Sequence, residues 1–354
     1  MMRVLYIAYP LLAVGEESCG GAEQVLSTVE RGMHARGHHT ALAAATGSRC
    51  AGELVPAGDA ADGPDRLEQR EREQWSAIQN ALRSRAITPD IIHDHSGSFW
   101  RHAVEVPLPV LATLHLPRNM YAPELFADTP ANVFFNCVSQ SQAEEFRDLQ
   151  GFVGVVENGI ELDRFPVRNE KDDFVLWLGR VCEEKGPHLA IAAARQASTK
   201  IILAGDVYPF RYHMDFWERE VAPHLDGRRV SFVRQPTFSA KLDLLRRARA
   251  VLISSEVAET SSLVAMEAMA CGTPVIAFRC GALAHIVADG ETGFLVDSVD
   301  EMARAIARMH EFEPEACRAR VAARHSHTMM LDGYVRLYRE VVRRNRKDLL
   351  ATAG

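Results

Sequence analysis

Residues 250–278 contain one complete crossover unit of a parallel β-sheet. An apolar run, Ala250–Ile253, ends in a polar loop, and a helix is predicted over Ser261–Ala270. The sequence Cys271-Gly272-Thr273-Pro274 ends that helix, and a second apolar run follows at Val275–Phe278. Two strands joined through a helix place loops and a helix N-terminus beside a ligand. The sequence therefore predicts an α/β fold with a parallel sheet.

Two glutamates lie close to this predicted helix. Glu259 falls in the loop before it, and Glu267 falls on a small, apolar helical face, where an unpaired charge is costly to bury. Eight helical positions span roughly 12 Å, whereas the carboxyl groups of a glycosidase lie about 5–9.5 Å apart. The spacing argues against glycoside hydrolysis and suits two carboxylates that bind different hydroxyl groups of one extended ligand. The alternative is an ordinary surface glutamate beside a structural one.

Composition and charge exclude several other classes of protein. The 354 residues are enough for two domains, and the formal net charge of −7 disfavours a nucleic-acid surface. The seven cysteines are scattered without a CxxC pair, so they indicate neither a disulfide framework nor a zinc site, and we expect a cytoplasmic location. The strand-like start, Met2–Ala8, does not resemble a signal peptide, and no apolar run approaches the roughly 20 residues of a membrane span.

The N-terminal half shows three strands that end at polar groups. The first, Val4–Ala8, is followed by a loop that contains Gly20-Gly21 and by a helix over Ala22–Arg36. Free N–H groups at such a helix N-terminus favour a phosphate, and an ordinary turn is the alternative. Two more apolar runs, Ile91–His95 and Val110–His115, end in histidine, where strands of a doubly wound sheet face a ligand.

The C-terminal half offers a candidate anion site and two charged helices. Arg180 and Lys185 follow a strand over Phe174–Leu178 and can converge on a diphosphate, the arginine as a fork and the lysine as a point charge. Solvated surface charge is the alternative. The polar stretch 63–85 is predicted to be a solvated helix. The basic run Arg343–Lys347 is predicted to be a solvated helix end, and peripheral membrane contact is compatible with it but not indicated.

The stretch from Glu259, E-T-S-S-L-V-A-M-E-A-M-A-C-G-T-P-V-I-A, closely resembles the Glu-x7-Glu signature of family-4 retaining glycosyltransferases (glycosyl transferases group 1). Three other motifs occur in the order of this family: G-G-A-E-x-V from Gly20, V-x-N-G-I-x-x-x-x-F ending at Phe165, and G-R-x-x-x-x-K-G from Gly179. The resemblance covers nearly the whole chain. The family usually has Phe-Gly after the first glutamate, whereas this chain has Thr260-Ser261, so the donor sugar is left open.

The resemblance implies an α/β fold of the GT-B type, with two Rossmann-like doubly wound domains facing across a cleft. It places an acceptor-side domain at residues 1–164 and a nucleotide-sugar donor domain at residues 165–330. A C-terminal helix over residues 331–350 is expected to cross back onto the first domain.

The activity implied by the resemblance is retaining hexosyl transfer from a nucleotide diphosphate sugar, with UDP favoured, to a small-molecule or lipid-linked acceptor. Fixed cations and amides would take the place of a metal, so no metal and no cofactor are expected. The resemblance assigns His115 and Glu259 to the sugar as the catalytic residues. It assigns donor binding to Gly20, Gly21, Arg180, Lys185, Thr260, Ser261, Ser262, Leu263, Val264 and Glu267, of which Glu267 would contact the ribose.

Two other functions remain open at this stage, because a fold does not settle a reaction. They are a sugar-nucleotide epimerase and a non-catalytic nucleotide-sugar-binding protein. A phosphorylase would need a lysine that carries pyridoxal phosphate, and the sequence has no recognisable site for one. The presence of His115 together with Arg180, Lys185 and both glutamates favours a transferase over a sensor. The sequence does not determine the acceptor, the nucleotide or the oligomeric state.

Overall fold

The computed structural model describes residues 1–10, 12–18, 20–60 and 66–352, with side chains described as far as Lys347. The chain divides into unit 1, Met1–Asn158 with His327–Gly354, and unit 2, Gly159–Ser326. The sequence predicts these boundaries after residues 164 and 330. The structure assigns Gly159 and the residues after it to unit 2 because Ile160 pairs with Ser326 and its N–H donates to the His325 carbonyl at 2.9 Å.

Unit 1 is built on a parallel sheet of seven strands among its described residues, in the order β3-β2-β1-β4-β5-β6-β7. The central strands are apolar runs buried on both faces, as parallel sheets require. The apolar runs Val4–Ala8, Ile91–His95 and Val110–His115 of the sequence correspond to β1, β4 and β5. The strands are β1 (Arg3–Ile7), β2 (His39–Ala44), β3 (Glu53–Pro56), β4 (Ile91–Asp94), β5 (Val110–Leu114), β6 (Val133–Cys137) and β7 (Phe152–Val155).

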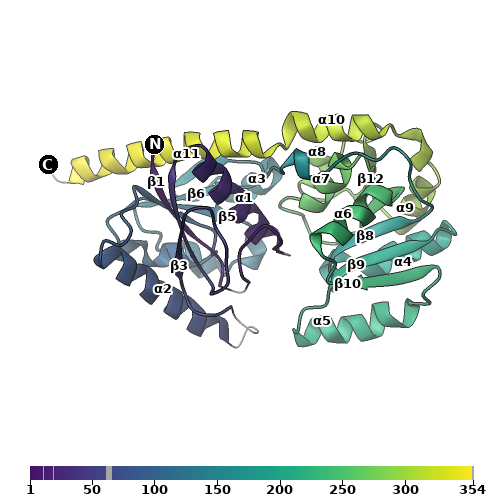
Figure 1. Ribbon diagram of the computed structural model, residues 1–354, viewed down its shortest axis with the longest axis horizontal. Coiled ribbons are helices and arrows are strands. Elements are labelled where there is room, and N and C mark those ends of the chain that lie inside the picture. Colours follow the sequence, from purple (N-terminus) through teal and green to yellow (C-terminus); the bar gives the residue numbers. More distant parts are fainter. Residues whose placement is uncertain (11, 19, 61–65, 353–354) are drawn as a thin grey trace. The chain divides into compact units, whose positions relative to one another are not determined.

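Four helices cover this sheet within the described part of unit 1: α1 (Gly21–Ala35), α2 (Leu67–Arg83), α3 (Gln140–Phe146) and α11 (His327–Thr352). Helix α11, yellow in Figure 1, returns to unit 1 after the chain has completed unit 2. Helix α2 corrects a prediction, because it is not solvated all round: Ile78 is fully buried, and the Gln74 amide donates to the Ala8 carbonyl at 2.8 Å. Residues 63–65 of the predicted helix lie outside the described residues.

Unit 2 is built on a second parallel sheet, of six strands among the residues described, in the order β10-β9-β8-β11-β12-β13. Successive residues of its strands enter different cores: Val175 and Trp177 pack on one face and Leu176 on the other. The strands are β8 (Val175–Arg180), β9 (Ile201–Asp206), β10 (Val230–Arg234), β11 (Ala250–Ile253), β12 (Val275–Phe278) and β13 (Gly293–Val296). The helices are α4 (Pro187–Gln196), α5 (Arg211–Phe216), α6 (Phe238–Arg247), α7 (Leu263–Ala270), α8 (Leu283–Ile286), α9 (Val299–Ile306) and α10 (Pro314–Arg324).

Each sheet has one point at which the strand order changes direction. In unit 1 it lies between β1 and β4, and in unit 2 it lies between β8 and β11. Loops that leave the carboxyl ends of the two strands at such a point diverge, and ligands bind in the crevice they leave. The chain therefore has one candidate binding region in each unit, formed after β1 and β4 and after β8 and β11.

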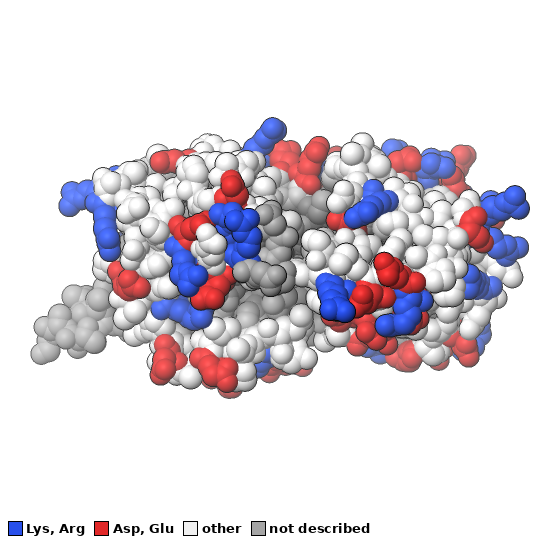
Figure 2. All heavy atoms as spheres, turned by 90° about the horizontal axis from the view of Figure 1, so that it is seen from below, with Lys and Arg blue, Asp and Glu red and all other residues white. Residues whose placement is uncertain are grey.

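The surface shows mixed charge. On the face drawn in Figure 2, basic and acidic side chains lie close to one another rather than in separate regions of one sign. Ion pairs also form within helices, such as Arg343 and Arg344 with Glu340. None of the described helices combines the length and the apolar character that a membrane span requires.

Candidate functional site

The loops after β8 and β11 bring Lys185 and Glu259 into contact in unit 2. The Lys185 ammonium lies 2.6 Å from Glu259 Oε1, and the Ser255 hydroxyl donates to the same oxygen. The Glu259 side chain is 11% exposed and that of Lys185 is 32% exposed, so the pair faces solvent mainly through the lysine. Sequence reasoning assigned these residues to different parts of a donor, and the structure shows that they form one charged site.

Two glycines allow the loops to approach this closely. A Cβ atom on Gly186 would lie 2.1 Å from the Ser254 carbonyl oxygen, and the Ser254 hydroxyl donates to the Gly186 carbonyl at 2.6 Å. A Cβ atom on Gly281 would lie 2.3 Å from the Glu259 carbonyl oxygen. Both glycines have positive φ, 60° and 52°. The loops that carry Lys185 and Glu259 are therefore packed closely against neighbouring backbone at both glycines.

The N-terminus of α7 adds backbone donors next to Glu259. Ser262 is the N-cap, and its hydroxyl accepts from the Ala265 N–H. The first N–H groups of a helix have no acceptor within the helix, so those of Leu263 and Val264 are available to an anion. Thr260 and Ser261 connect Glu259 to this cap, and Ser261 Oγ is buried without a hydrogen-bond partner among the described residues.

Glu267 lies inside α7 and is paired within the protein. Its side chain is 4% exposed, and Oε1 lies 2.7 Å from the ammonium of Lys241 in α6. The sequence indicated that a buried carboxylate here needs a partner but did not identify Lys241, because the two residues belong to different helices. The ribose contact assigned to Glu267 stays a prediction, and it would involve a lysine–glutamate pair rather than a lone carboxylate.

Arg180 ends β8 and lies near an aromatic ring. Its guanidinium carbon is 5.7 Å from the centroid of the Tyr208 ring, a distance typical of a cation–π contact. Among the described residues, Arg180 Nε is buried without a hydrogen-bond acceptor. The Nε–H group of Arg180 can therefore donate a hydrogen bond to a ligand near the loop that contains Lys185.

In unit 1, Gly20 and Gly21 lie where the sequence predicted, at the start of α1. Gly20 is the N-cap, and its carbonyl accepts from the Gln24 N–H at 3.0 Å. A Cβ atom on Gly20 would lie 1.9 Å from the Glu23 carboxylate. Burial raises the pKa of Glu23, which is 6% exposed. Glu23 belongs to the G-G-A-E-x-V motif, and its carboxylate lies against the predicted phosphate loop.

The strand ends of β4 and β5 form a chain of three histidines. His115 Nε2 lies 2.9 Å from His95 Nδ1, and His95 Nε2 lies 3.4 Å from His93 Nδ1. His93 Nδ1 also contacts the hydroxyl of Tyr338 in α11 at 2.7 Å, and His93 Nε2 contacts Thr113 Oγ1 at 2.7 Å. The sequence showed a histidine at the end of each of these two strands, and the structure connects His93 and His95 to His115.

Hydrogen bonds at the deep end of this chain constrain the His93 ring. The Thr113 hydroxyl donates to Asn136 Oδ1, so it accepts from His93 Nε2. His93 Nδ1 lies within hydrogen-bond distance of both the Tyr338 hydroxyl and His95 Nε2, and the Tyr338 hydroxyl donates to that of Tyr6 at 3.2 Å. The network therefore fixes the orientation of the deepest ring and connects it through His95 to His115.

Burial keeps the rings of His93, His95 and His115 neutral. The free energy of unfolding is therefore expected to decrease at acidic pH. Burial lowers the pKa of His115 to about 4 and holds those of His93 and His95 well below the usual value. The unfolded rings bind protons near pH 6.5 and the folded rings do not, so their stabilisation is complete above pH 6.5 and is lost as the pH falls. The His115 ring should contribute about 2 kcal/mol less to the free energy of unfolding at pH 5 than at pH 7, and the rings of His93 and His95 act in the same direction.

Protonation of Asp94 changes the free energy of unfolding in the opposite direction. Burial raises its pKa to about 6, so the folded state binds this proton more readily and regains about 1 kcal/mol at pH 5. We therefore expect the thermal unfolding midpoint to fall from pH 7 to pH 5, and to fall less in a His95→Gln variant. A midpoint that rises or stays constant over this range would contradict the neutral histidine chain.

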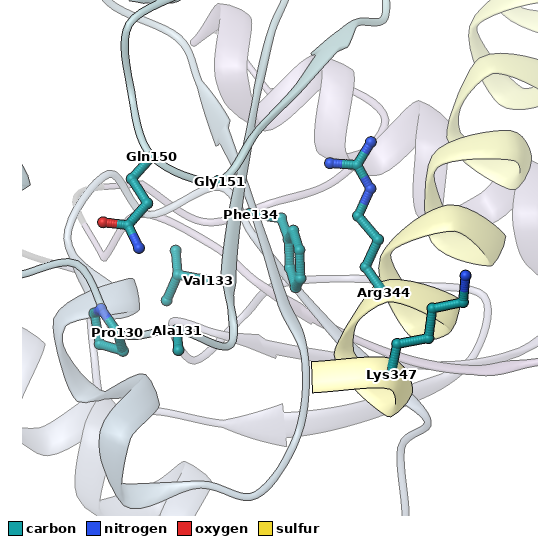
Figure 3. A pocket seen from close by; sticks show the side chains of 8 residues that line it. All are labelled: Pro130, Ala131, Val133, Phe134, Gln150, Gly151, Arg344 and Lys347. Carbon is teal, nitrogen blue, oxygen red and sulfur yellow. The ribbon is translucent and has the colours of Figure 1, made fainter. Parts of the chain in front are cut away.

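Figure 3 shows a pocket of unit 1 that contains none of the predicted site residues. Arg344 and Lys347 project from α11 on one side of it, and Val133 and Gln150 lie on the other. Arg344 is already paired with Glu340 at 2.7 Å. The pocket therefore gives no independent support to an anion or lipid site.

Two family models match this chain in sequence. The model described as Glycosyltransferase Family 4 matches residues 19–164, and the model described as Glycosyl transferases group 1 matches residues 160–326. Together they match residues 19–326.

Relatives with curated names are similar over part of their length. The glycogen synthase of Mycobacterium tuberculosis is 28% identical over 240 residues, which cover 59% of this chain and 56% of that protein. The D-inositol 3-phosphate glycosyltransferase of Acidothermus cellulolyticus is 31% identical over 187 residues, which cover 49% of this chain and 42% of that protein. The chain thus spans about half the length of these relatives.

A solved structure matches over almost the full length of both chains. The crystal structure of Anabaena HepE in complex with UDP and glucose superposes with a TM-score of 0.74 at 17% sequence identity. The match covers 96% of this chain and 100% of that chain. At this level of identity the similarity establishes the fold.

Proposed function

Because the chain belongs to the family-4 glycosyltransferases and has their GT-B fold, we propose that it transfers a sugar from a nucleotide diphosphate sugar to an acceptor. The predicted α/β architecture with two doubly wound units is confirmed. The observation that carries the proposed activity is the Lys185–Glu259 pair at the point in unit 2 where the strand order changes direction.

Charge is the main requirement of this reaction, because the diphosphate gains negative charge as its bond to the sugar breaks. Lys185 is the point charge that meets it, and Arg180 supplies a guanidinium from the end of β8. The N–H groups of Leu263 and Val264 add fixed dipoles at the N-terminus of α7. Groups that are already oriented toward a developing charge stabilise the transition state without reorganising.

Glu259 is assigned to the hydroxyl groups of the transferred sugar. Its carboxylate contacts both Lys185 and Ser255, so its position is fixed before a ligand arrives. A sugar bound to Glu259 would therefore have its diphosphate next to Lys185. His115 is assigned to the sugar near the reacting carbon, and Gly20-Gly21 to the phosphate. Retention of the anomeric configuration is part of the proposal.

The nucleotide and the metal requirement are also proposals. We favour UDP, since Anabaena HepE was crystallised with UDP and glucose. The positive charges of Lys185 and Arg180 perform the role that a divalent cation has in other transferases, so we propose that transfer needs no metal bridge to the diphosphate. The expected cytoplasmic location stays a prediction.

The acceptor is proposed only by chemical class. One relative is named for inositol 3-phosphate and another for glycogen synthesis. Both names indicate hydroxyl groups of a polyol or carbohydrate as the attacking groups. We therefore propose an acceptor of this kind, with or without a phosphate or lipid attached.

The first test is thermal stabilisation of the purified protein by a panel of nucleotides and nucleotide-sugars. A ligand at 100 times its dissociation constant adds about 2.7 kcal/mol to the free energy of unfolding, which shifts the midpoint clearly. We expect UDP and one UDP-sugar to give the largest shift. Each shift is measured against ligand-free protein in the same buffer, with and without EDTA, and should not depend on EDTA.

The same panel separates the proposed reaction from its alternatives. Incubation with the stabilising nucleotide-sugar and a polyol acceptor should release the nucleoside diphosphate and form a glycoside with retained configuration, as followed by proton NMR. Conversion of the nucleotide-sugar into an epimer would indicate an epimerase. Binding without either reaction would indicate a sensor, and no stabilisation by any member would remove the donor site.

A further inference from the structure

Cys182, Glu184 and His213 form a cluster in unit 2 that the proposed reaction does not use. Cys182 and Glu184 lie in the loop after β8, and His213 lies in α5, which follows β9. A sulfur, a carboxylate oxygen and an imidazole nitrogen from these residues all lie within 4.8 Å of one another. Strands β8 and β9 are parallel neighbours, so their carboxyl ends bring the two segments together.

His213 has the polar atoms that most need an explanation. The residue is fully buried, yet neither ring nitrogen has a hydrogen-bond partner in the described part of the chain. Its neighbours include the aromatic rings of Phe210 and Tyr212. Glu184 Oε2 is also buried, and it too lacks a partner among the residues described. A buried polar atom left unsatisfied costs roughly 1–3 kcal/mol, so three of them in one place indicate a missing ligand.

We propose that Cys182, Glu184 and His213 bind a zinc ion, with water as the fourth ligand. Zinc takes thiolate, imidazole and carboxylate ligands, and three protein ligands with one water is an established arrangement. Ligand atoms around a tetrahedral zinc ion lie roughly 3.5 Å apart, so side-chain movements of about 1 Å close the cluster. On binding, the Cys182 thiol releases its proton to solvent, and the thiolate and carboxylate offset the two charges of the ion.

The charged groups near the cluster are compatible with a zinc ion. Histidine binds zinc as the neutral imidazole, through either ring nitrogen. The guanidinium of Arg180 opposes a second cation, and this is why both Cys182 and Glu184 are required as anionic ligands. An ion here would join α5 to the segment that follows β8.

Binding of zinc does not depend on the proposed sugar transfer, so it is tested separately. The full chain is reduced, treated with EDTA, dialysed and titrated with Co²⁺, and its absorption is recorded. One equivalent of Co²⁺ should produce a thiolate-to-cobalt charge-transfer band, which Zn²⁺ should remove by displacement. Zinc should also raise the thermal unfolding midpoint of the same sample.

Variants assign the ligands. Cys182→Ser should abolish the charge-transfer band, and Glu184→Gln should weaken zinc binding about tenfold or more. Cys50→Ser removes a partly buried thiol of unit 1 and should leave the band and the affinity unchanged. Absence of the band in the wild-type protein, or its persistence in Cys182→Ser, would overturn the proposal.

The Glu184→Gln variant tests the site even if Cys182→Ser does not fold. Glu184 is partly exposed and glutamine has the same shape, so unchanged zinc affinity in Glu184→Gln would also overturn the site. Donor binding is measured on the same preparations. Zinc binding without any nucleotide-sugar binding would support the zinc site and contradict the proposed function. Nucleotide-sugar binding without zinc binding would support the proposed function and contradict the zinc site.

Discussion

Lys185→Ala is expected to lower kcat by roughly 10²–10³, the loss that follows removal of one preorganised group from a developing negative charge. The variant removes the ammonium that lies 2.6 Å from Glu259 in the proposed donor site. It should also weaken binding of the nucleotide-sugar several-fold, because the charge on the diphosphate is present before the bond breaks. Steady-state kinetics and a binding titration with the stabilising nucleotide-sugar measure the two effects.

Lys200→Ala is the matched control for this variant. Lys200 lies in the same unit, between α4 and β9, and is exposed, so its loss should leave kcat and donor affinity unchanged. Because Lys185 and Glu259 touch, the effects of Lys185→Ala and Glu259→Gln should not add in the double variant. Full activity and donor affinity in Lys185→Ala would remove the diphosphate assignment, and full activity in Glu259→Gln would remove the sugar assignment.

Lys241→Met should destabilise the protein by about 3–5 kcal/mol, because it leaves the Glu267 carboxylate buried without its cation. The Glu267 side chain is 4% exposed and that of Lys241 is 15% exposed, so water cannot replace the lost partner well. The thermal unfolding midpoint should fall on the order of 10 °C. The double variant Lys241→Met with Glu267→Gln should recover most of this loss, since no unpaired charge remains.

A surface pair provides the control for this prediction. Arg249 contacts Asp173 at 2.9 Å, and the Asp173 side chain is 82% exposed. Arg249→Met should therefore change the free energy of unfolding by less than about 1 kcal/mol. If Lys241→Met were as mild as Arg249→Met, the Glu267 carboxylate would not depend on Lys241.

The sequence alone predicted the parts of this protein that depend on local pattern. Continuous apolar runs such as Val110–His115 are strands because a parallel sheet buries both faces. The crossover unit from Ala250 to Phe278 is visible because its strand, loop and helix follow one another in the chain. Lys185, in the loop after β8, and Glu259, in the loop before α7, were predicted in the same way, because both lie next to the ends of predicted elements.

Tertiary structure decided which of these residues meet. Lys185 contacts Glu259, 74 positions away, because β8 pairs with β11 rather than with β10. The partner of Glu267 comes from another helix, and the chain of histidines ends on Tyr338, 245 positions from His93.

The same reason explains why cysteine spacing gave no sign of a metal site. Cys182 and His213 are 31 positions apart in the sequence, and the pairing of β8 with β9 places them within ligand distance of one ion. Strand order in a parallel sheet does not follow chain order, because each crossover can return to either side of the preceding strand. Residue types and their local setting are therefore determined by the sequence pattern, whereas their partners are determined by the order of the strands.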